Sequence, residues 1–222
     1  MIIALTNSKG GVGKTTIAVH LAAWLHDKGQ KVVLVDADTQ AASSMWLGEA
    51  VAGAALLRLQ TADDVLERLP KLGTEVDYVV VDGPAGLSEV TRAILFACDV
   101  AVLPCGPSVL DLRAASDALR IVRQVQTIRK GPPGVVMVPN KLQIQYRLSQ
   151  EFLEAVHGLD VPVLEGLRLR QAFADAAGQG TVVWRLPTRS GQEATFEMQE
   201  LLERIINHDT DKTLNGRSAA NS

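Results

Sequence analysis

A glycine-rich segment with two lysines, close to the start of the chain, carries the residue types that bind polyphosphates. The segment SKGGVGKTT begins at Ser8 and directly follows an apolar run. The usual phosphate-binding loop reads G-x-x-x-x-G-K-[ST]. Residues 13–15 (GKT) supply the end of that motif, Ser8 stands at its first glycine position, and Lys9 adds a second lysine. The pattern predicts a nucleotide-binding loop of an unusual kind.

Each residue type in this loop has a physical role at a triphosphate. Successive backbone N–H groups and the positive end of the following helix attract the phosphates, and glycines let the backbone approach them. We expect Lys14 to bridge the β- and γ-phosphates and the Thr15 hydroxyl to ligate Mg²⁺, which prefers oxygen ligands. A plain glycine-rich turn is the alternative, which the strand before the loop and the helical pattern after it disfavour. The residues predicted to contact the nucleotide are Lys9, Gly10, Gly11, Val12, Gly13, Lys14, Thr15 and Thr16.

Aspartates follow two further apolar runs. Residues 31–35 lead into Asp36 and Asp38, and residues 78–81 lead into Asp82. Two acids directly after a buried strand cost free energy unless they have a partner, and a metal ion with a water molecule to orient would supply one. We expect Asp82 to hold Mg²⁺, directly or through water. A turn residue at the end of a strand is the alternative for Asp82.

Taken together, these motifs resemble those of the ParA/MinD family of dimerising ATPases, whose deviant Walker A motif matches residues 9–16 (KGGVGKTT). The resemblance implies that Lys9 contacts the nucleotide bound by the other subunit, although a solvated lysine is also consistent with the sequence. It implies that Asp38 positions or activates the attacking water and that Asp36 contributes to the Mg²⁺ shell. The family usually has proline after the second aspartate of this D-x-D-x-Q segment, where this chain has Thr39.

Later segments extend the resemblance over about residues 2–206. Residues 83–86 (GPAG) resemble the switch segment that senses the γ-phosphate, and residues 107–111 (PSVLD) resemble a segment leading into a long helix near the dimer face. Asn140 follows an apolar run, and the resemblance implies that it faces the adenine base; an asparagine that only ends a strand is the competing interpretation. Residues 169–182 match a late family segment without adding chemistry.

Strands and helices alternate along the chain, which predicts an α/β single-domain P-loop NTPase fold: a mostly parallel twisted sheet with helices on both faces. All the motif acids then fall at the carboxyl edge of the sheet, where ligands bind in such folds. The expected strands span residues 2–7, 31–36, 76–82, 99–104, 133–139 and 161–164, with 54–59 as a possible edge strand. The expected helices span residues 14–28, 62–72, 88–97, 109–129, 147–157, 170–177 and 191–207.

Composition narrows the class of protein. With 222 residues and 47% hydrophobic content, the chain can bury the core of one domain. We expect residues 1–207 to form the P-loop ATPase domain and residues 208–222 a disordered polar tail. The tail lacks the basic amphipathic helix by which the MinD branch binds membranes. No apolar run is long enough for a membrane span and no secretory signal is visible, so we expect a cytoplasmic protein without a membrane partner.

The net charge of −3 argues against a generically cationic nucleic-acid binder, but it allows a local basic face in a dimer. Solvated surface arginines are the ordinary alternative. The candidate basic residues are Arg113, Arg120, Arg123, Arg129, Lys130, Lys141, Arg147, Arg168 and Arg170.

Two cysteines, Cys98 and Cys105, flank a predicted buried strand and are expected to act as small buried hydrophobes. The nitrogenase iron protein and the iron–sulfur scaffold ATPases share the deviant loop but need cysteines that bridge a cluster. The spacing here is poor for that purpose, which disfavours a cluster-carrying ATPase.

The resemblance therefore implies a small ParA-type partition ATPase without an N-terminal helix-turn-helix. Its ligands would be ATP/ADP and Mg²⁺, its intrinsic turnover weak, and its ATP-bound form a sandwich homodimer that binds DNA nonspecifically and associates with the nucleoid. A cargo-bound ParB-like or other adaptor protein would stimulate hydrolysis, and the cargo would be a plasmid, a chromosome or a protein organelle. The alternatives are a MinD/Mrp-like ATPase serving a non-DNA client, such as cofactor assembly, and a structural nucleotide-dependent dimer with negligible turnover.

Overall fold

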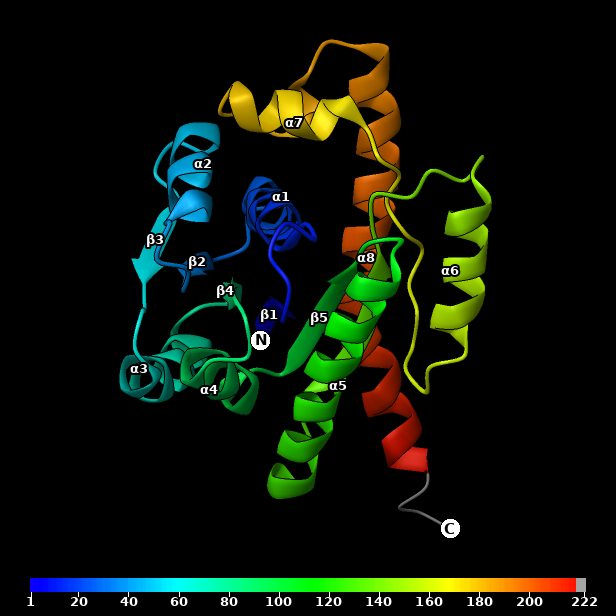
Figure 1. Ribbon diagram of the computed structural model, residues 1–222. Helices are drawn as coiled ribbons and strands as arrows, with labels where there is room; N and C mark the ends of the chain where they lie inside the picture. The colour runs from blue at the N-terminus through cyan, green and yellow to red at the C-terminus, as the bar shows by residue number, and fades with distance from the viewer. Residues whose placement is uncertain (219–222) are drawn as a thin grey trace.

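A six-stranded sheet in the order β3-β2-β4-β1-β5-β6 forms the centre of the molecule, and every paired strand is parallel to its neighbour (Figure 1). The computed structural model describes the backbone of residues 1–218 and the side chains of residues 1–208. The strands are β1 (Ile2–Asn7), β2 (Val32–Asp36), β3 (Ala55–Arg58), β4 (Tyr78–Ala85), β5 (Val100–Cys105) and β6 (Gly134–Pro139). The predicted α/β fold with a parallel sheet is confirmed.

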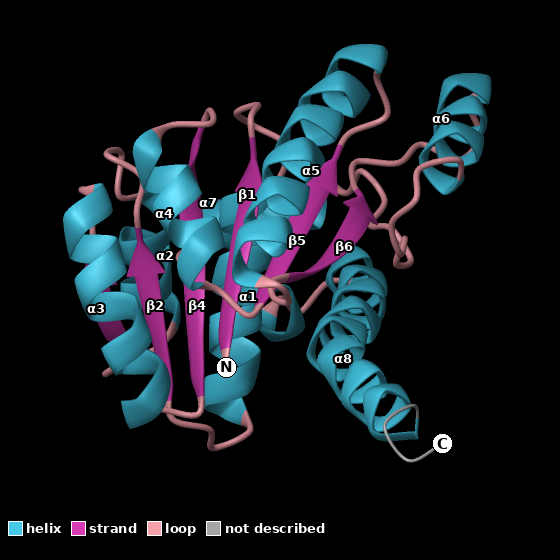
Figure 2. Ribbon diagram, turned by 90° about the horizontal axis from the view of Figure 1, so that it is seen from below, coloured by secondary structure: helices cyan, strands magenta, loops and turns pink. Residues whose placement is uncertain are grey.

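Helices cover both faces of the sheet (Figure 2). Alternate residues of each strand point to opposite faces: Ile3 and Leu5 of β1 join one apolar core, whereas Ile2 and Ala4 join the other. The helices are α1 (Lys14–Asp27), α2 (Ala42–Ala50), α3 (Ala62–Glu75), α4 (Glu89–Ala97), α5 (Val109–Arg129), α6 (Arg147–His157), α7 (Gln171–Gly178) and α8 (Arg189–Ser218), with a short 3-10 helix η1 (Val183–Arg185). Residues of α1, α2, α7 and α8 pack in the first core, and residues of α3, α4, α5 and α6 in the second.

Side-chain caps explain where several helices begin. The hydroxyls of Thr61, Ser88 and Ser108 each accept a hydrogen bond from the backbone N–H three residues further on, at the starts of α3, α4 and α5. Such a cap satisfies one of the N–H groups that a helix leaves free at its N-terminus. The sequence therefore fixes the entry into each of these helices, including the one that follows the edge strand β3.

The structure corrects two details of the expected layout. Residues 161–164 form no strand; Val163 makes only an isolated bridge to Met137, because the chain leaves the sheet after two backbone hydrogen bonds. Helices α2 and η1 were not predicted from the sequence. The backbone of α8 extends to Ser218, and the predicted disorder of residues 208–222 stays a prediction. The end of the predicted tail, residues 219–222, lies outside the described residues.

Among the helices of the described residues, none combines the length and the apolar composition that crossing a bilayer requires.

Candidate nucleotide site

The loop between β1 and α1 has the backbone shape that its glycines predict. Gly11 and Gly13 lie in the left-handed region, with φ of 74° and 104°, which residues with a Cβ rarely adopt. A Cβ at Gly13 would also collide with the side-chain amide of Asn140. The loop therefore needs glycine at Gly13 for two independent reasons, one conformational and one steric.

Lys14, the first residue of α1, is only 6% exposed, and its Nζ donates to the backbone carbonyl of Lys9 at 3.1 Å. The ammonium is thus folded back over the loop. Burial lowers the pKa of Lys14, while the nearby carboxylates of Asp82 and Asp38 act in the opposite direction. A phosphate entering the loop would meet this cation with little water around it, which strengthens their attraction.

Asp82, on β4, lies beside the loop and has unused bonding capacity. The Thr15 hydroxyl donates to Asp82 Oδ2 at 2.8 Å, whereas Oδ1 is buried without a hydrogen-bond partner among the described residues. Burial raises the pKa of Asp82 to about 6, and the charge of Asp36 acts in the same direction. Oxygen donors of this kind suit Mg²⁺. The orphaned carboxylate oxygen next to a hydroxyl therefore fits the cation predicted from the sequence.

Asp36 pairs with Asp82 across β2 and β4, so the two carboxylates stand at the same edge of the sheet. Both oxygens of Asp36 are already engaged: Oδ1 accepts from the backbone N–H of Asp38 at 3.1 Å and Oδ2 from that of Ser44 at 2.9 Å. Asp36 thus fixes the turn that leads into α2. Its predicted place in the Mg²⁺ shell stays a prediction. The described residues hold no cluster of three or more His, Cys, Asp or Glu side chains suited to a metal ion.

Asp38 is half-buried and lies two residues beyond the end of β2, and its Oδ1 accepts from the backbone N–H of Gln40 at 2.9 Å. The other carboxylate oxygen of Asp38 has no hydrogen-bond partner among the described residues, so it can accept a hydrogen bond from a water molecule. The charge of Asp38 acts on Lys14, so the residue lies in the electrostatic field of the phosphate loop. Its role as the water-positioning group stays a prediction.

Lys9 forms an ion pair within its own chain. Its Nζ lies 2.6 Å from Asp111 Oδ1, and the Ser108 hydroxyl holds Asp111 Oδ2 at 2.5 Å. Burial raises the pKa of Asp111, but the bonds to Lys9 and Ser108 outweigh it and leave the pKa below its ordinary value. The Lys9 side chain is 42% exposed, so it is accessible from outside the loop. The predicted contact of Lys9 with a second subunit stays a prediction.

Asn140 follows β6 and supports the phosphate loop from the far side. Its Nδ2 donates to the carbonyl of Val12 at 2.7 Å, and its Oδ1 accepts from the N–H of Lys141 at 2.8 Å. The Lys141 ammonium in turn donates to the carbonyl of Gly11 at 2.7 Å. The amide is therefore occupied in bracing the loop, and its predicted contact with adenine remains a prediction.

A cavity of about 280 Å³ opens beside the loop, large enough for a planar base. Phe173 of α7 and Leu169 supply apolar surface to it. The lining residues are Gly13, Thr16, Asn140, Lys141, Leu167, Arg168, Leu169, Arg170, Phe173, Ala174 and Ala177. Residues 169–182 were predicted to match a family segment that adds no chemical role. The spacing of these residues in the sequence does not indicate that part of this segment lines a cavity next to the phosphate loop.

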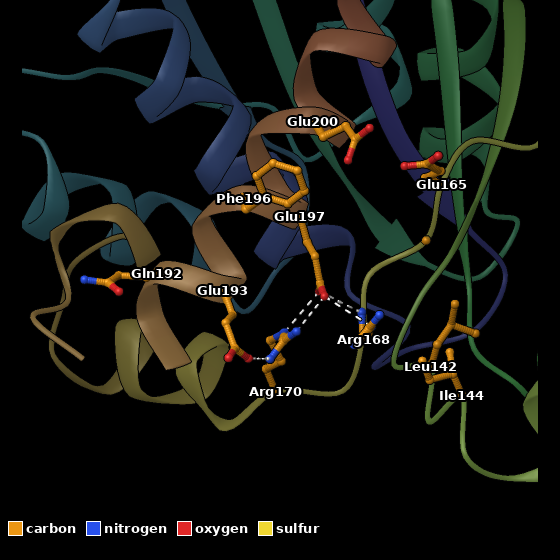
Figure 3. A pocket seen from close by; sticks show the side chains of 11 residues that line it. Leu142, Ile144, Glu165, Arg168, Arg170, Gln192, Glu193, Phe196, Glu197 and Glu200 are labelled. Atoms are coloured by element: carbon orange, nitrogen blue, oxygen red, sulfur yellow. Dashed lines mark hydrogen bonds and ion pairs between the residues drawn. The ribbon is translucent and has the colours of Figure 1, made fainter. Parts of the chain in front are cut away.

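An ion-pair network braces the segment that forms one wall of this cavity (Figure 3). Arg170 lies between two acids of α8: its Nη2 is 2.7 Å from Glu197 Oε1, and its Nη1 is 2.5 Å from Glu193 Oε2. Arg168 reaches the same Glu197 from the side, at 3.4 Å. Figure 3 also shows Phe196 projecting from α8 above this network, in a groove of about 750 Å³. The network ties the cavity wall to the long C-terminal helix.

Most of the basic residues considered as DNA contacts are engaged within the chain. Arg113 and Lys130, both from the α5 region, have no ion-pair or hydrogen-bond partner through their side chains among the described residues. The engaged residues are Arg120, Arg123, Arg129, Lys141, Arg147, Arg168 and Arg170.

Cys98 and Cys105 are free and buried on either side of β5, as the sequence predicted. Burial raises the pKa of each thiol to about 12. Ligands to a metal cluster must face a space that can hold it, whereas both of these side chains are buried in the same apolar core. The two cysteines are thus poorly suited to hold an iron–sulfur cluster.

A parallel sheet with a glycine-rich loop leading from its first strand into a helix defines a P-loop nucleotide-binding protein. The model of the CobQ/CobB/MinD/ParA nucleotide binding domain matches residues 3–183. The chain belongs to this family, and the resemblance drawn from its motifs is confirmed.

Curated relatives align with this chain over more than nine-tenths of its length. The chain is 32% identical to the maintenance of carboxysome distribution protein A of Halothiobacillus neapolitanus, over 92% of this chain and 95% of that protein. It is 28% identical to the chromosome-partitioning ATPase Soj of Thermus thermophilus, over 91% of this chain and 96% of that protein. Among solved structures, a variant of Cyanothece McdA in complex with ATP matches with a TM-score of 0.77 and 16% identity, over 91% of this chain and 95% of that one. At that identity the structural match supports the fold alone.

Proposed function

We propose that this chain is a ParA-type positioning ATPase: a Mg²⁺-dependent ATP hydrolase that dimerises on ATP, binds DNA nonspecifically and distributes a cargo through an adaptor protein. The observation that carries the proposal is the convergence of Lys14, Thr15 and Asp82 at one edge of the sheet. They surround a loop whose additional lysine, Lys9, is accessible from outside. The relatives that act on carboxysomes and chromosomes support the positioning role.

Each residue has a distinct part in the proposed reaction. Lys14 and the loop N–H groups bind the phosphates, and Lys14 compensates negative charge as the bond to the γ-phosphate breaks. Thr15 and Asp82 hold Mg²⁺, which neutralises phosphate charge when bound, and Asp36 supports that shell from the turn it fixes. Asp38 accepts a hydrogen bond from the attacking water and thereby orients it.

The position of Lys9 supports the proposed dimerisation. In the single chain Lys9 is paired with Asp111. In the proposed ATP dimer it exchanges this carboxylate for the phosphates of the partner subunit, which carry more charge. Val109 and Leu110, at the start of the same helix as Asp111, are 62% and 65% exposed and offer apolar surface for a subunit contact. ATP would thus be required to hold the two subunits together.

The proposed nucleotide-binding residues include Asn140, which sits between the loop and the cavity. Its contribution would be to keep the loop and the base at a fixed spacing. The cavity lined by Phe173 and Leu169 receives the adenine ring, which gains from apolar burial and aromatic contact.

The proposed cargo is a protein organelle, because relatives named for carboxysome distribution match at full length. DNA would serve as the matrix along which the cargo is distributed, so the ATP-bound dimer would associate with the nucleoid. Arg113 and Lys130 are the candidates for phosphate contacts, because neither forms an ion pair with any of the described residues. An adaptor protein bound to the cargo would stimulate hydrolysis and release the dimer from DNA.

The test is a titration of nonspecific duplex DNA with the protein loaded with ADP, ATP or a slowly hydrolysed ATP analogue, at several salt concentrations. Binding that requires the triphosphate and weakens steeply with salt is the expected result, because phosphate contacts release counterions. Lys14→Ala is the control that cannot load nucleotide. Absence of DNA binding in every nucleotide state would contradict the positioning role and favour a client other than DNA.

A further inference from the structure

His20 is a buried, uncharged histidine on α1, one helical turn after Thr16, and none of the roles above uses it. Its ring is completely buried, and burial lowers its pKa to about 4. Buried polar groups in proteins are normally satisfied by specific partners, so the partners of this ring reveal what it connects.

Both ring nitrogens are engaged, and their partners fix the tautomer. The backbone N–H of Val183 points at Nε2 at 3.2 Å, and because an N–H can only donate, Nε2 must accept. A neutral imidazole then carries its proton on Nδ1, which lies 2.7 Å from the carbonyl of Thr16 and donates to it. His20 therefore links the helix behind the phosphate loop to η1, across 163 positions of sequence.

Three aromatic rings surround the imidazole edge-on. The ring centroids of Trp46, Trp184 and Phe173 lie 5.4, 5.5 and 5.9 Å from that of His20, with interplanar angles of 88°, 75° and 81°. Edge-on contacts of this kind are directional. The imidazole thus sets the orientation of the rings as well as their distance.

Two of these partners line the cavity beside the phosphate loop. Thr16 contributes to it from α1 and Phe173 from α7. The hydrogen bond from His20 holds Thr16, and the ring contact of His20 holds Phe173.

We propose that His20 is a positioning residue that sets the base-binding wall of the nucleotide site by holding Phe173 at a fixed place relative to Thr16. The proposal rests on the proposed function, because it takes the cavity as the site of the adenine ring. It assigns His20 no contact with the phosphates. Loss of His20 should therefore weaken recognition of the base and leave recognition of the phosphate chain unchanged.

The experiment compares the affinities of ATP and of inorganic tripolyphosphate, both with Mg²⁺, for the wild type and His20→Leu. Leucine removes both hydrogen bonds, and we expect ATP to bind about tenfold more weakly while tripolyphosphate binds as before. His20→Gln keeps a donor and an acceptor but lacks the ring that contacts Phe173, so it should show the same loss of ATP affinity relative to tripolyphosphate. Leu202→Ala, which truncates a fully buried residue of α8 that does not line the cavity, is the matched control for lost stability and should leave the ratio unchanged.

If His20→Leu is too unstable for titration, His20→Asn makes the same comparison, because asparagine keeps polar groups but also lacks the ring that contacts Phe173. A ratio equal to that of the wild type in the variants that lack this ring would overturn the proposal. A wild-type protein that binds tripolyphosphate but not ATP would overturn the base pocket as well. A wild type that binds neither ligand would contradict the proposed function itself.

Discussion

Lowering the pH should destabilise the folded chain through His20, in a window that the structure defines. In an unfolded chain the pKa of histidine is about 6.5, whereas burial lowers the pKa of His20 in the folded chain to about 4. Between these values the unfolded chain binds a proton that the folded chain does not. The free energy of unfolding therefore falls as the pH decreases through this window and changes no further below it.

The size of the effect follows from the width of the window. One pKa unit corresponds to about 1.4 kcal/mol, so the full shift of His20 amounts to about 3 kcal/mol between pH 7 and pH 4. Asp82 acts in the opposite direction, because its folded pKa of about 6 lies above its ordinary value and favours the folded chain at low pH. The free energy of unfolding of the wild type therefore depends on pH through both His20 and Asp82, and a variant is needed to separate the two contributions.

The assay is urea unfolding of the wild type and His20→Gln at pH 7, 6, 5 and 4, followed by tryptophan fluorescence. Glutamine does not titrate, whereas Asp82 is common to both proteins and cancels in the difference. The stability of the wild type relative to His20→Gln should fall by about 3 kcal/mol across the series. A difference that stays constant over the whole range would refute the assignment of His20 as a neutral buried histidine.

Three substitutions test the roles assigned at the phosphate loop. Lys14→Ala removes the buried cation and should weaken ATP binding by about 100-fold or more in isothermal titration; retained tight binding would count against the loop assignment. Lys9→Ala should leave nucleotide binding by the monomer intact but abolish the ATP dimer in sedimentation, and a dimer that persists would mean that the lysine acts only within its own chain. Asp38→Ala should slow phosphate release by about 100-fold or more and trap the dimer, whereas unchanged turnover would exclude Asp38 as the residue that orients water.

The parts of the fold set by local pattern could be predicted from the sequence. Continuous apolar runs identified β1, β2, β4, β5 and β6, because a strand buried on both faces has no polar alternation. The glycines and lysines of residues 8–16 identified the loop, since few other contexts require that combination. The edge strand β3, with its mostly exposed residues, was predicted only as a possibility.

Contacts between distant segments could not be predicted in the same way. The bond of Asn140 to Val12 spans 128 positions and that of His20 to Val183 spans 163. Nothing in the spacing of these residues indicates that they meet. The pairing of Lys9 with Asp111 is of the same kind: each belongs to a recognised motif, but only the folded chain brings them within 2.6 Å.

Helix α2 was missed for a local reason. It begins after Ala41, a non-glycine residue with a φ of 55°, and its start is fixed by the Asp36 carboxylate rather than by a cap next to it in sequence.

The association state of the ATP-loaded protein tests the central claim most directly. Sedimentation velocity of the wild type with ADP, and of the wild type and Asp38→Ala with ATP and Mg²⁺, would measure it at micromolar protein concentration. The account predicts a monomer with ADP and a dimer with ATP, most fully populated in the Asp38→Ala variant, because each Lys9 must then bind the triphosphate of the other subunit. A strictly monomeric protein in all of these states would contradict it.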